Sequence, residues 1–252
     1  MQELFFFDAD CRIGSGPLIG VRPDAAELIA EMDNFGIDKA LVRHGNFAML
    51  GAPGGNRDLV RLMEADEARR LYGVWCVLPS QCRELPEPEQ LFREMKELRI
   101  SALTLMPDDH LFVACRLTVG KLMDAAAERR VPVFMEAVGN DWRNLYAFIA
   151  EFPRNRFIIA DRYGKWGHDR QIRPLLENYE SVYFCTTGYW VPEGIRDLTA
   201  LYGPERILYG SGFPRYDQGS GMLQLKHSGL AEAEIAKIAG KNLEKLLSEA
   251  QL

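Results

Sequence analysis

The sequence predicts an α/β protein, a single (β/α)8 TIM barrel in which residues 1–252 form one domain. Eight short apolar segments alternate with helical patterns from one end of the chain to the other. These segments are apolar on both faces and long stretches separate them, which is typical of parallel strands covered by helices. Barrels of this kind commonly reach about 250 residues as one unit. The 252 residues therefore fit one barrel.

The eight predicted strands are short, β-rich runs. In chain order they cover residues 4–9, 39–43, 71–78, 101–106, 131–137, 156–161, 181–186 and 206–210.

Helical patterns lie between the strands. The first follows Pro23-Asp24 and stops at Gly36, and Asp141 is expected to cap another. The apolar faces of the first, fifth and last helices are Leu28, Ile29, Met32 and Phe35; Leu145, Phe148, Ile149 and Phe152; and Ile235, Ile238, Leu243, Leu246 and Leu247. Similar patterns follow Asn56, Pro88, Thr118, His168 and Pro192.

An open doubly wound sheet is the competing architecture. The segment Gly14-Ser15-Gly16-Pro17 after the first strand lacks the third glycine and the following helix of a dinucleotide fingerprint, which disfavours that fold. Residues 45–55 and 212–229 are longer than plain connections need. In a barrel they would emerge at the C-terminal face, where we expect either lids over a site or ordinary surface loops.

The composition limits the partners. A net charge of -6 and a high acidic content give no footprint for nucleic acid or for an anionic membrane. The start, Met1-Gln2-Glu3, has neither the basic region nor the cleavage site of a signal peptide, and no apolar run approaches the roughly 18 residues of a membrane span. We expect a cytoplasmic protein. The five cysteines show no Cys-x-x-Cys spacing and are expected to be free thiols.

Four strand motifs carry a resemblance to a known family. Residues 5–14 (FFFDADCRIG) are similar to the pattern Asp-Ala-His-x-His-x-Gly, and residues 206–214 (RILYGSGFP) are similar to Arg-Ile-Leu-Phe-Gly-Ser-Asp-x-Pro. These patterns resemble the opening strand and the eighth strand of the amidohydrolase superfamily, in its amidohydrolase-related branch. Residues 131–136 (VPVFME) and 157–161 (FIIAD) resemble the fifth and sixth strands, each of which ends in a metal-binding histidine in that superfamily. The resemblance implies a barrel with hydrolase or decarboxylase chemistry.

All five positions at which the resemblance implies metal ligands carry other residues. They are Asp10, Arg12, Glu136, Asp161 and Gly212. A guanidinium has only donors to offer and cannot be a ligand, so we expect neither zinc nor another cofactor.

The replacements suggest a different site. We expect the Arg12 guanidinium to lie roughly where relatives hold the metal, among the carboxylates of Asp10, Glu136 and Asp161, because crowded carboxylates need a cation that can bridge them. The rival hypothesis keeps a metal of another type, Mg²⁺ or Mn²⁺, on the same three carboxylates. Arg12 argues against it, since a fixed positive charge lowers the affinity for a divalent ion.

Further polar and aromatic side chains follow the predicted strands, and we expect them to bind a small, anionic or aromatic ligand. They are Arg43, His44, His110, Tyr163, Trp190 and Arg215. Each also has a purely structural explanation at a strand end or on the rim.

Three functional hypotheses remain open. In the first, the protein is a divergent hydrolase or lyase that acts on a small carboxylate or cyclic ester without zinc, with Asp10, Arg12, Glu136 and Asp161 as the catalytic set. In the second, it is a catalytically inactive relative that binds a small molecule or a protein partner. In the third, it is a Mg²⁺ or Mn²⁺ enzyme. The oligomeric state stays open.

Overall fold

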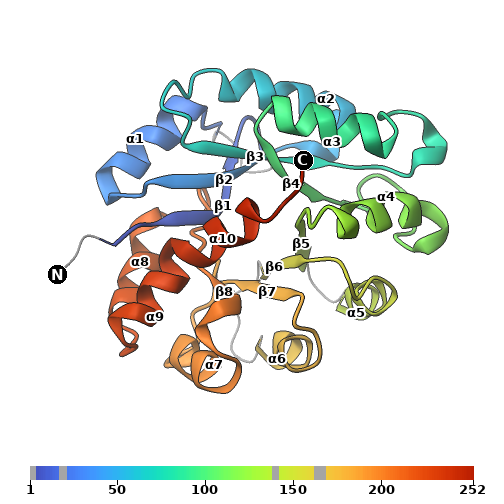
Figure 1. Ribbon diagram of the computed structural model, residues 1–252. Coiled ribbons are helices and arrows are strands. Elements are labelled where there is room, and N and C mark those ends of the chain that lie inside the picture. The colour runs from blue at the N-terminus through green and yellow to red at the C-terminus, as the bar shows by residue number, and fades with distance from the viewer. Residues whose placement is uncertain (1–3, 17–21, 138–141, 162–168) are drawn as a thin grey trace.

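A computed structural model describes residues 4–16, 22–137, 142–161 and 169–252. Its eight strands form one parallel sheet in sequential order, as the alternating pattern predicts (Figure 1). The strands are β1 (Phe7–Ile13), β2 (Lys39–His44), β3 (Leu71–Cys76), β4 (Ile100–Thr104), β5 (Val133–Ala137), β6 (Phe157–Asp161), β7 (Val182–Cys185) and β8 (Ile207–Leu208).

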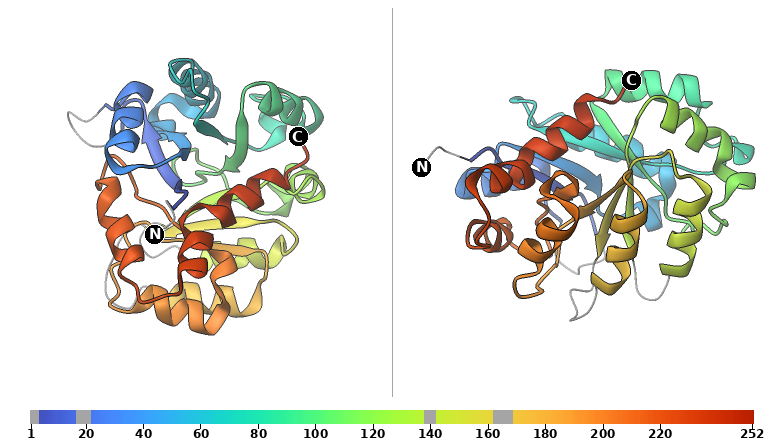
Figure 2. Two further views of the ribbon diagram at one scale, coloured as in Figure 1. Left: turned by 60° about the vertical axis from the view of Figure 1, so that its left-hand side comes forward. Right: turned by 60° about the horizontal axis from the view of Figure 1, so that its bottom comes forward.

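The helices surround the sheet, and Figure 2 shows them on the outside of the strands from two further directions. They are α1 (Ala25–Phe35), α2 (Phe47–Met63), α3 (Pro88–Glu97), α4 (Arg116–Glu128), α5 (Trp142–Glu151), α6 (Asp169–Asn178), α7 (Gly194–Tyr202), α8 (Gln218–Lys226), α9 (Glu232–Ala236) and α10 (Asn242–Ser248). None of the helices in the described ranges combines the length and the apolar character that a membrane crossing requires.

The sheet is joined into a barrel by the segment that follows β8. The Ala9 amide donates to the Tyr209 carbonyl, and the Arg12 amide donates to the Phe213 carbonyl, both at 2.9 Å. In the opposite direction, the Gly212 amide donates to the Asp10 carbonyl at 2.9 Å. These bonds satisfy the backbone groups of β1 that would otherwise lie at an open sheet edge. They also bring residues 209–213 against the first strand.

Alternate residues of the strands fill the inside of the barrel. The inner cluster comprises Phe7, Ala9, Leu41, Val74, Ala102, Phe134, Ile158, Ala160, Cys185 and Leu208, and Leu243 and Leu246 of α10 join it. The Glu244 carboxylate on α10 accepts from Lys39, the first residue of β2, so α10 closes the end where the strands begin (Figure 1). We call the opposite end, where the strands finish, the mouth. Polar side chains lie there.

Local signals explain the first helix. The Asp24 side chain accepts from the Glu27 amide and the Glu27 side chain accepts from the Asp24 amide, which forms a capping box. Gly36 ends the helix at φ 71°, a left-handed conformation that glycine adopts without steric cost.

Two predicted long loops contain helices instead. Residues 45–55 lie largely within α2, and residues 212–229 include α8. The sequence Gly51-Ala52-Pro53-Gly54-Gly55 disfavours a helix, and Gly51 does break α2 at φ 66°. Tertiary contacts outweigh this propensity, because the buried Asn56 side chain bonds both the amide and the carbonyl of Cys76. The predicted Asp141 cap falls outside the described residues.

Candidate functional site

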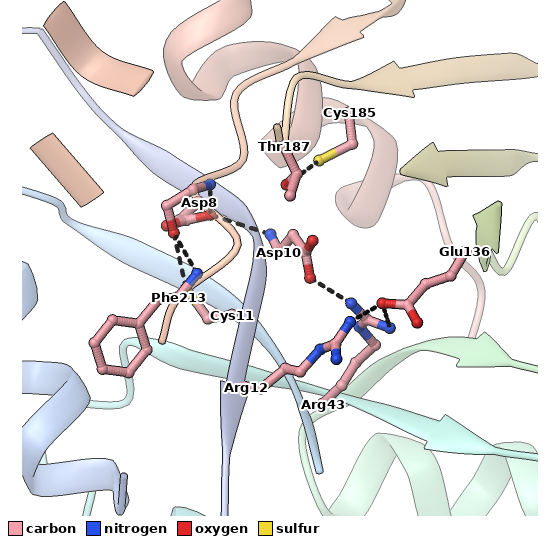
Figure 3. Close-up of polar contacts among 10 residues, drawn as sticks. Asp8, Asp10, Cys11, Arg12, Arg43, Glu136, Cys185, Thr187 and Phe213 are labelled. Atoms are coloured by element: carbon pink, nitrogen blue, oxygen red, sulfur yellow. Dashed lines mark hydrogen bonds and ion pairs between the residues drawn. The ribbon is translucent and has the colours of Figure 1, made fainter. Parts of the chain in front are cut away.

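An irregularity in β1 decides which of its side chains reach the mouth. The parallel register with β2 pairs Arg12 with Arg43 and shifts between Asp8 and Cys11. Asp10 and Arg12 consequently both contact one cluster at the mouth, whereas Asp8 takes partners from the β8–α8 segment (Figure 3).

The cluster at the mouth is a chain of ion pairs that we call the arginine network: Asp10, Arg43, Glu136 and Arg12. Arg43 Nη2 donates to Asp10 Oδ1, and Arg43 Nη1 lies 2.8 Å from Glu136 Oε1. Arg12 Nη2 donates to the same Glu136 oxygen. Figure 3 shows both guanidinium groups turned toward Glu136. The structure thus brings together three of the four residues that we predict to be catalytic, with Arg43 between them.

Burial makes these pairs interdependent. The side chains of Asp10 and Arg43 are 2% and 6% exposed, and the Arg43 guanidinium carbon lies 4.0 Å from the centre of the Phe134 ring. A buried charge is tolerated only when a partner compensates the lost solvation. Two permanent cations and two carboxylates therefore stabilise each other here.

Two predicted site residues cannot be placed. The backbone of Asp161 pairs with Ala137 at the end of β6, but its side chain lies outside the described part. Tyr163 lies outside the described residues altogether. Their roles stay predictions.

His44 connects β2 to α2 rather than joining the arginine network. Its Nδ1 accepts from the Asn46 amide at 3.0 Å, so Nε2 carries the proton that reaches Asp58 Oδ2 at 2.9 Å. Burial lowers the pKa of His44, while the hydrogen bond from Arg61 lowers the pKa of Asp58. The His44 imidazole is therefore neutral and held in one orientation, and it supports the start of α2.

His110 also makes structural contacts. Its Nε2 lies 2.9 Å from the Phe47 carbonyl oxygen, and its Nδ1 lies 3.7 Å from Cys76 Sγ. Burial raises the pKa of Cys76 to about 12, so this thiol is protonated at neutral pH. His110 therefore ties the segment after β4 to the start of α2.

Trp190 and Arg215 meet at the rim through a residue that our sequence reasoning overlooked. The Tyr216 and Trp190 rings form a T-shaped pair with 6.2 Å between their centroids, and the Arg215 guanidinium carbon lies 5.7 Å from the centre of the Tyr216 ring. Aromatic residues near a strand end are too common for sequence alone to identify Tyr216.

The position where the superfamily pattern has its last aspartate is filled by neighbours. Gly212 has φ 80°, and a Cβ built there would lie 2.7 Å from Thr187 Cγ2 and 3.1 Å from Tyr216 Cδ2. Two residues earlier, a Cβ on Gly210 would lie 2.7 Å from Thr187 Oγ1 and would collide with Cys185 Sγ. Both glycines are required by the close packing of the end of β7 and the residues that follow it against this segment.

Asp8 is a second buried carboxylate that spacing alone does not reveal. It accepts from the amides of Asp10 and Ser211 at 3.1 and 2.9 Å, and from Gln218 Nε2 at 2.9 Å. Strict alternation would place Asp8 on the same face as Asp10, but the register shift in β1 separates them. Asp8 thereby fastens the β8–α8 segment to β1.

Asp8 should make the stability of the protein depend on pH. Burial raises its pKa above the usual value, so the folded state binds its proton more tightly than the unfolded state does. The stability that this protonation contributes is therefore lost as the pH rises from the pKa of Asp8 in the unfolded state toward its pKa in the folded state. The loss is at most about 1.4 kcal/mol per pH unit. Asp8→Asn keeps the acceptor for both amides, and its new N–H group can meet Gln218 Oε1, which has no partner among the described residues.

We expect the stability advantage of wild type over Asp8→Asn to shrink between pH 4.5 and pH 7.5. Urea denaturation at both pH values measures it. A difference that is constant, or that grows with pH, would show that Asp8 does not titrate in this way.

The donor set at the mouth does not fit a zinc ion. Zinc sites use imidazole or thiolate lone pairs, whereas Arg12 has none, and Asp10 and Glu136 accept from guanidinium groups. Both nitrogens of His44 and His110 have other partners. Within the described ranges, no three His, Cys, Asp or Glu side chains are grouped so that they could hold a metal ion.

Comparisons with solved structures find the same fold at low identity. An uncharacterised TIM-barrel protein of Bordetella bronchiseptica is 17% identical, with a TM-score of 0.73 over 98% of this chain and 99% of that one. A 2,6-dihydroxybenzoate decarboxylase from Rhizobium is 13% identical, with a TM-score of 0.72, and the match covers 98% of this chain and 99% of that one. A probable 2-pyrone-4,6-dicarboxylic acid hydrolase from Acinetobacter baumannii, solved with citric acid bound, is 14% identical, with a TM-score of 0.71. That match covers 96% of this chain and 99% of the other.

No curated protein matches the sequence closely enough to be reported as a relative. The amidohydrolase family model, however, matches residues 23–248, which is most of the chain. Together with the barrel, this match establishes that the chain belongs to the amidohydrolase family.

Proposed function

We propose that this protein binds a small carboxylate or cyclic ester at the barrel mouth and acts on it as a hydrolase or decarboxylase without zinc. The observation that carries the proposal is the arginine network, in which Glu136 is held between Arg12 and Arg43. A proton-transfer group beside a fixed cation is a combination that both reactions need.

The four residues divide into an inner and an outer pair. Asp10 and Arg43 are deeply buried, so they form a rigid base for the site. The Arg12 side chain is 18% exposed and that of Glu136 is 11% exposed, which leaves this pair nearer to an incoming ligand. Arg12 and Glu136 are therefore our candidates for direct contact with substrate.

Each candidate has a defined task. For a cyclic ester, Glu136 would take a proton from the attacking water while Arg12 N–H groups stabilise the oxyanion, and the same proton then passes to the ring oxygen that leaves. For an aromatic acid, Glu136 would first take a proton from water and then deliver it to the ring carbon, as the bond between that carbon and the substrate carboxylate breaks and CO₂ departs. Asp161 is the second candidate for proton transfer.

The solved neighbours support this substrate class. One is named for decarboxylation of a dihydroxybenzoate, and another for hydrolysis of a pyrone dicarboxylic acid and holds citric acid. The molecules named are carboxylic acids, which a guanidinium binds well.

A substrate panel with matched variants tests the proposal. Wild type is assayed with 2,6-dihydroxybenzoate, 2-pyrone-4,6-dicarboxylate and simple lactones in the presence of EDTA. For any substrate turned over, we expect Glu136→Gln to lower kcat about 10²–10⁴-fold and Arg12→Gln to lower it about 10²–10³-fold. The controls Glu89→Gln and Arg154→Gln, which change exposed members of surface ion pairs, should leave kcat unchanged. Turnover that is indifferent to Glu136 and Arg12 would refute the assignment.

One observation favours a second function, the binding of a small molecule without catalysis. Both described carboxylates of the arginine network already accept from guanidinium groups, whose N–H groups occupy the oxygens that a catalytic base would use. Under this alternative, calorimetry detects 2,6-dihydroxybenzoate binding that Arg12→Gln abolishes, and no substrate of the panel reacts.

The Mg²⁺ or Mn²⁺ alternative makes a different prediction. Asp10 and Glu136 would have to exchange their arginine partners for the ion, with Asp161 as the third ligand. Turnover that EDTA abolishes and Mn²⁺ restores, with anomalous density among these three side chains in a soaked crystal, would establish it.

A further inference from the structure

Three side chains from two neighbouring segments contact one another on the rim of the mouth. We call them the rim subsite: Trp190 from the segment after β7, and Arg215 and Tyr216 from the segment after β8. Tyr216 lies between the other two, because its ring forms the T-shaped pair with Trp190 and the Arg215 guanidinium lies over it. The rim subsite therefore combines two aromatic rings with one cation.

Backbone hydrogen bonds fix Arg215 close to Arg12 of the arginine network. The Arg12 amide donates to the Phe213 carbonyl at 2.9 Å, and Phe213 lies beside β1 in Figure 3. The Arg215 amide then donates to the Gly212 carbonyl at 2.9 Å, which closes a turn. Neighbouring strands lie about 4.8 Å apart and two residues reach at most about 7 Å, so the backbones of Arg12 and Arg215 are within roughly 12 Å. Two side chains of this length can contact one small ligand.

The Tyr216 ring packs against the same turn. A Cβ built on Gly212 would lie 3.1 Å from Tyr216 Cδ2, and the Gly212 amide donates to the Asp10 carbonyl at 2.9 Å. Tyr216 therefore contacts backbone that is bonded directly to a member of the arginine network. The aromatic part of the rim subsite and the ion pairs of the mouth are thus neighbours.

The Trp190 indole is exposed, although the backbone before it is ordered. The Tyr189 amide donates to the Thr186 carbonyl at 3.0 Å, and the Tyr189 carbonyl accepts from Gln224 Nε2 at 2.8 Å. Trp190 is nevertheless 42% exposed. An indole held in place in this way offers a flat apolar surface, on which a planar ring packs at low entropic cost.

The Arg215 charge is available to a ligand. Arg12 pairs with Glu136, whereas Arg215 has no carboxylate partner among the described residues. The acidic residue nearest to it in sequence, Asp217, is engaged at the start of α8, where its Oδ1 accepts from the Ser220 amide at 2.8 Å. A guanidinium that lies over a tyrosine ring keeps its N–H donors for a two-point contact with a carboxylate.

We propose that the rim subsite binds the second acid group of a planar dicarboxylic acid, an inference that rests on the function proposed for the arginine network. Arg12 engages the reacting carboxylate or ester group, and Arg215 binds the other carboxylate. Trp190 and Tyr216 contact the ring that joins the two groups. A monocarboxylic acid leaves Arg215 without a partner, and a flexible dicarboxylic acid loses the ring contacts and pays more entropy on binding.

Three acids separate these contributions. Isophthalate has two carboxylates on a benzene ring, benzoate has the ring with one carboxylate, and glutarate has two carboxylates with the same three-carbon spacing but no ring. Calorimetry of the full chain at pH 7 with EDTA measures their affinities. We expect isophthalate to bind about 10-fold or more tightly than either of the others, because only isophthalate uses both the cation and the rings.

Two substitutions should each affect a different subset of these ligands. Arg215→Gln should weaken isophthalate binding about 10-fold and leave benzoate unchanged. Trp190→Leu should weaken isophthalate and benzoate about 3–10-fold and leave glutarate unchanged. The control Arg93→Gln changes an exposed arginine on α3 and should alter none of the three affinities. Unchanged thermal midpoints show that the variants are folded.

The outcomes distinguish this inference from the proposed function. The rim subsite would be overturned if isophthalate failed to bind, bound no more tightly than benzoate, or bound equally well to Arg215→Gln. Turnover in the substrate panel that depends on Glu136 while the affinities ignore Arg215 would overturn the rim subsite alone. Arg215-dependent binding without any turnover would support the rim subsite and overturn the catalytic assignment.

Discussion

Replacing Arg43 with methionine should lower the free energy of unfolding by about 3–5 kcal/mol, the usual cost of removing one partner from a buried ion pair. Arg43 neutralises Asp10 in a site where the carboxylate is 2% exposed, and it also contacts Glu136. Methionine preserves much of the length and the apolar contact with Phe134 but leaves Asp10 without its cation. Urea denaturation at pH 7 measures the loss.

Two further variants show whether charge is the cause. Asp10→Asn combined with Arg43→Met removes both charges of the inner pair, so it should recover part of the loss. Arg61→Met changes an arginine that is 70% exposed and should alter stability by less than about 0.5 kcal/mol. A loss below 1 kcal/mol for Arg43→Met would mean that water reaches Asp10 and that the pair is not effectively buried.

The substitution Gly212→Asp should destabilise the protein by about 2–4 kcal/mol, because two unfavourable effects combine. The backbone has φ 80°, which strains any residue with a Cβ, and the new atom would lie 2.7 Å from Thr187 and 3.1 Å from Tyr216. Thermal and urea denaturation report the loss, and zinc should not reverse it.

Gly36→Asp is the matched control. Gly36 also has a left-handed backbone, at φ 71°, but among the described residues beyond its chain neighbours no atom lies within 4 Å of a Cβ built there. It should cost only about 1 kcal/mol, the contribution of the backbone alone. Equal losses at both positions would contradict the crowding that we infer at Gly212.

The two predictions concern one change in the site. Arg43 engages Asp10, and Thr187 with Tyr216 fills the space beside Gly212. At both positions, the side chains of neighbouring strands and loops already occupy the surroundings. A single substitution at either position therefore meets an occupied or neutralised environment.

Much of the fold could be predicted from sequence because its signals are local. All eight strands lie where short apolar runs predict them, with ends that differ by a few residues, since pairing with neighbours decides where a strand stops. The sequence also predicts that α1 is capped by Asp24 and ends at Gly36, as the structure confirms. By contrast, α2 begins at Phe47 despite its glycines, because the packing of Asn56 against β3 has no local signal.

Part of the site could also be predicted, because some of its signals are local. The opposite charges of Arg12 and Glu136 on strand ends led us to expect their contact. The position of Arg43 between Asp10 and Glu136 depends on register across three strands, which spacing within one strand does not encode. Asp8 was overlooked because the irregularity in β1 breaks the two-residue alternation on which the reasoning relied.

The hydrogen bonds between β1 and residues 209–213 have a consequence for folding during synthesis of the protein. The Asp8 carboxylate bonds an amide 203 positions later and a side chain 210 positions later. A nascent chain emerging from the ribosome must therefore keep its first strand unsatisfied along one edge until nearly the whole polypeptide has been made, and contacts so distant in sequence form slowly. The arginine network shares that strand, so it should be among the last parts of the fold to take its final form in the newly made molecule.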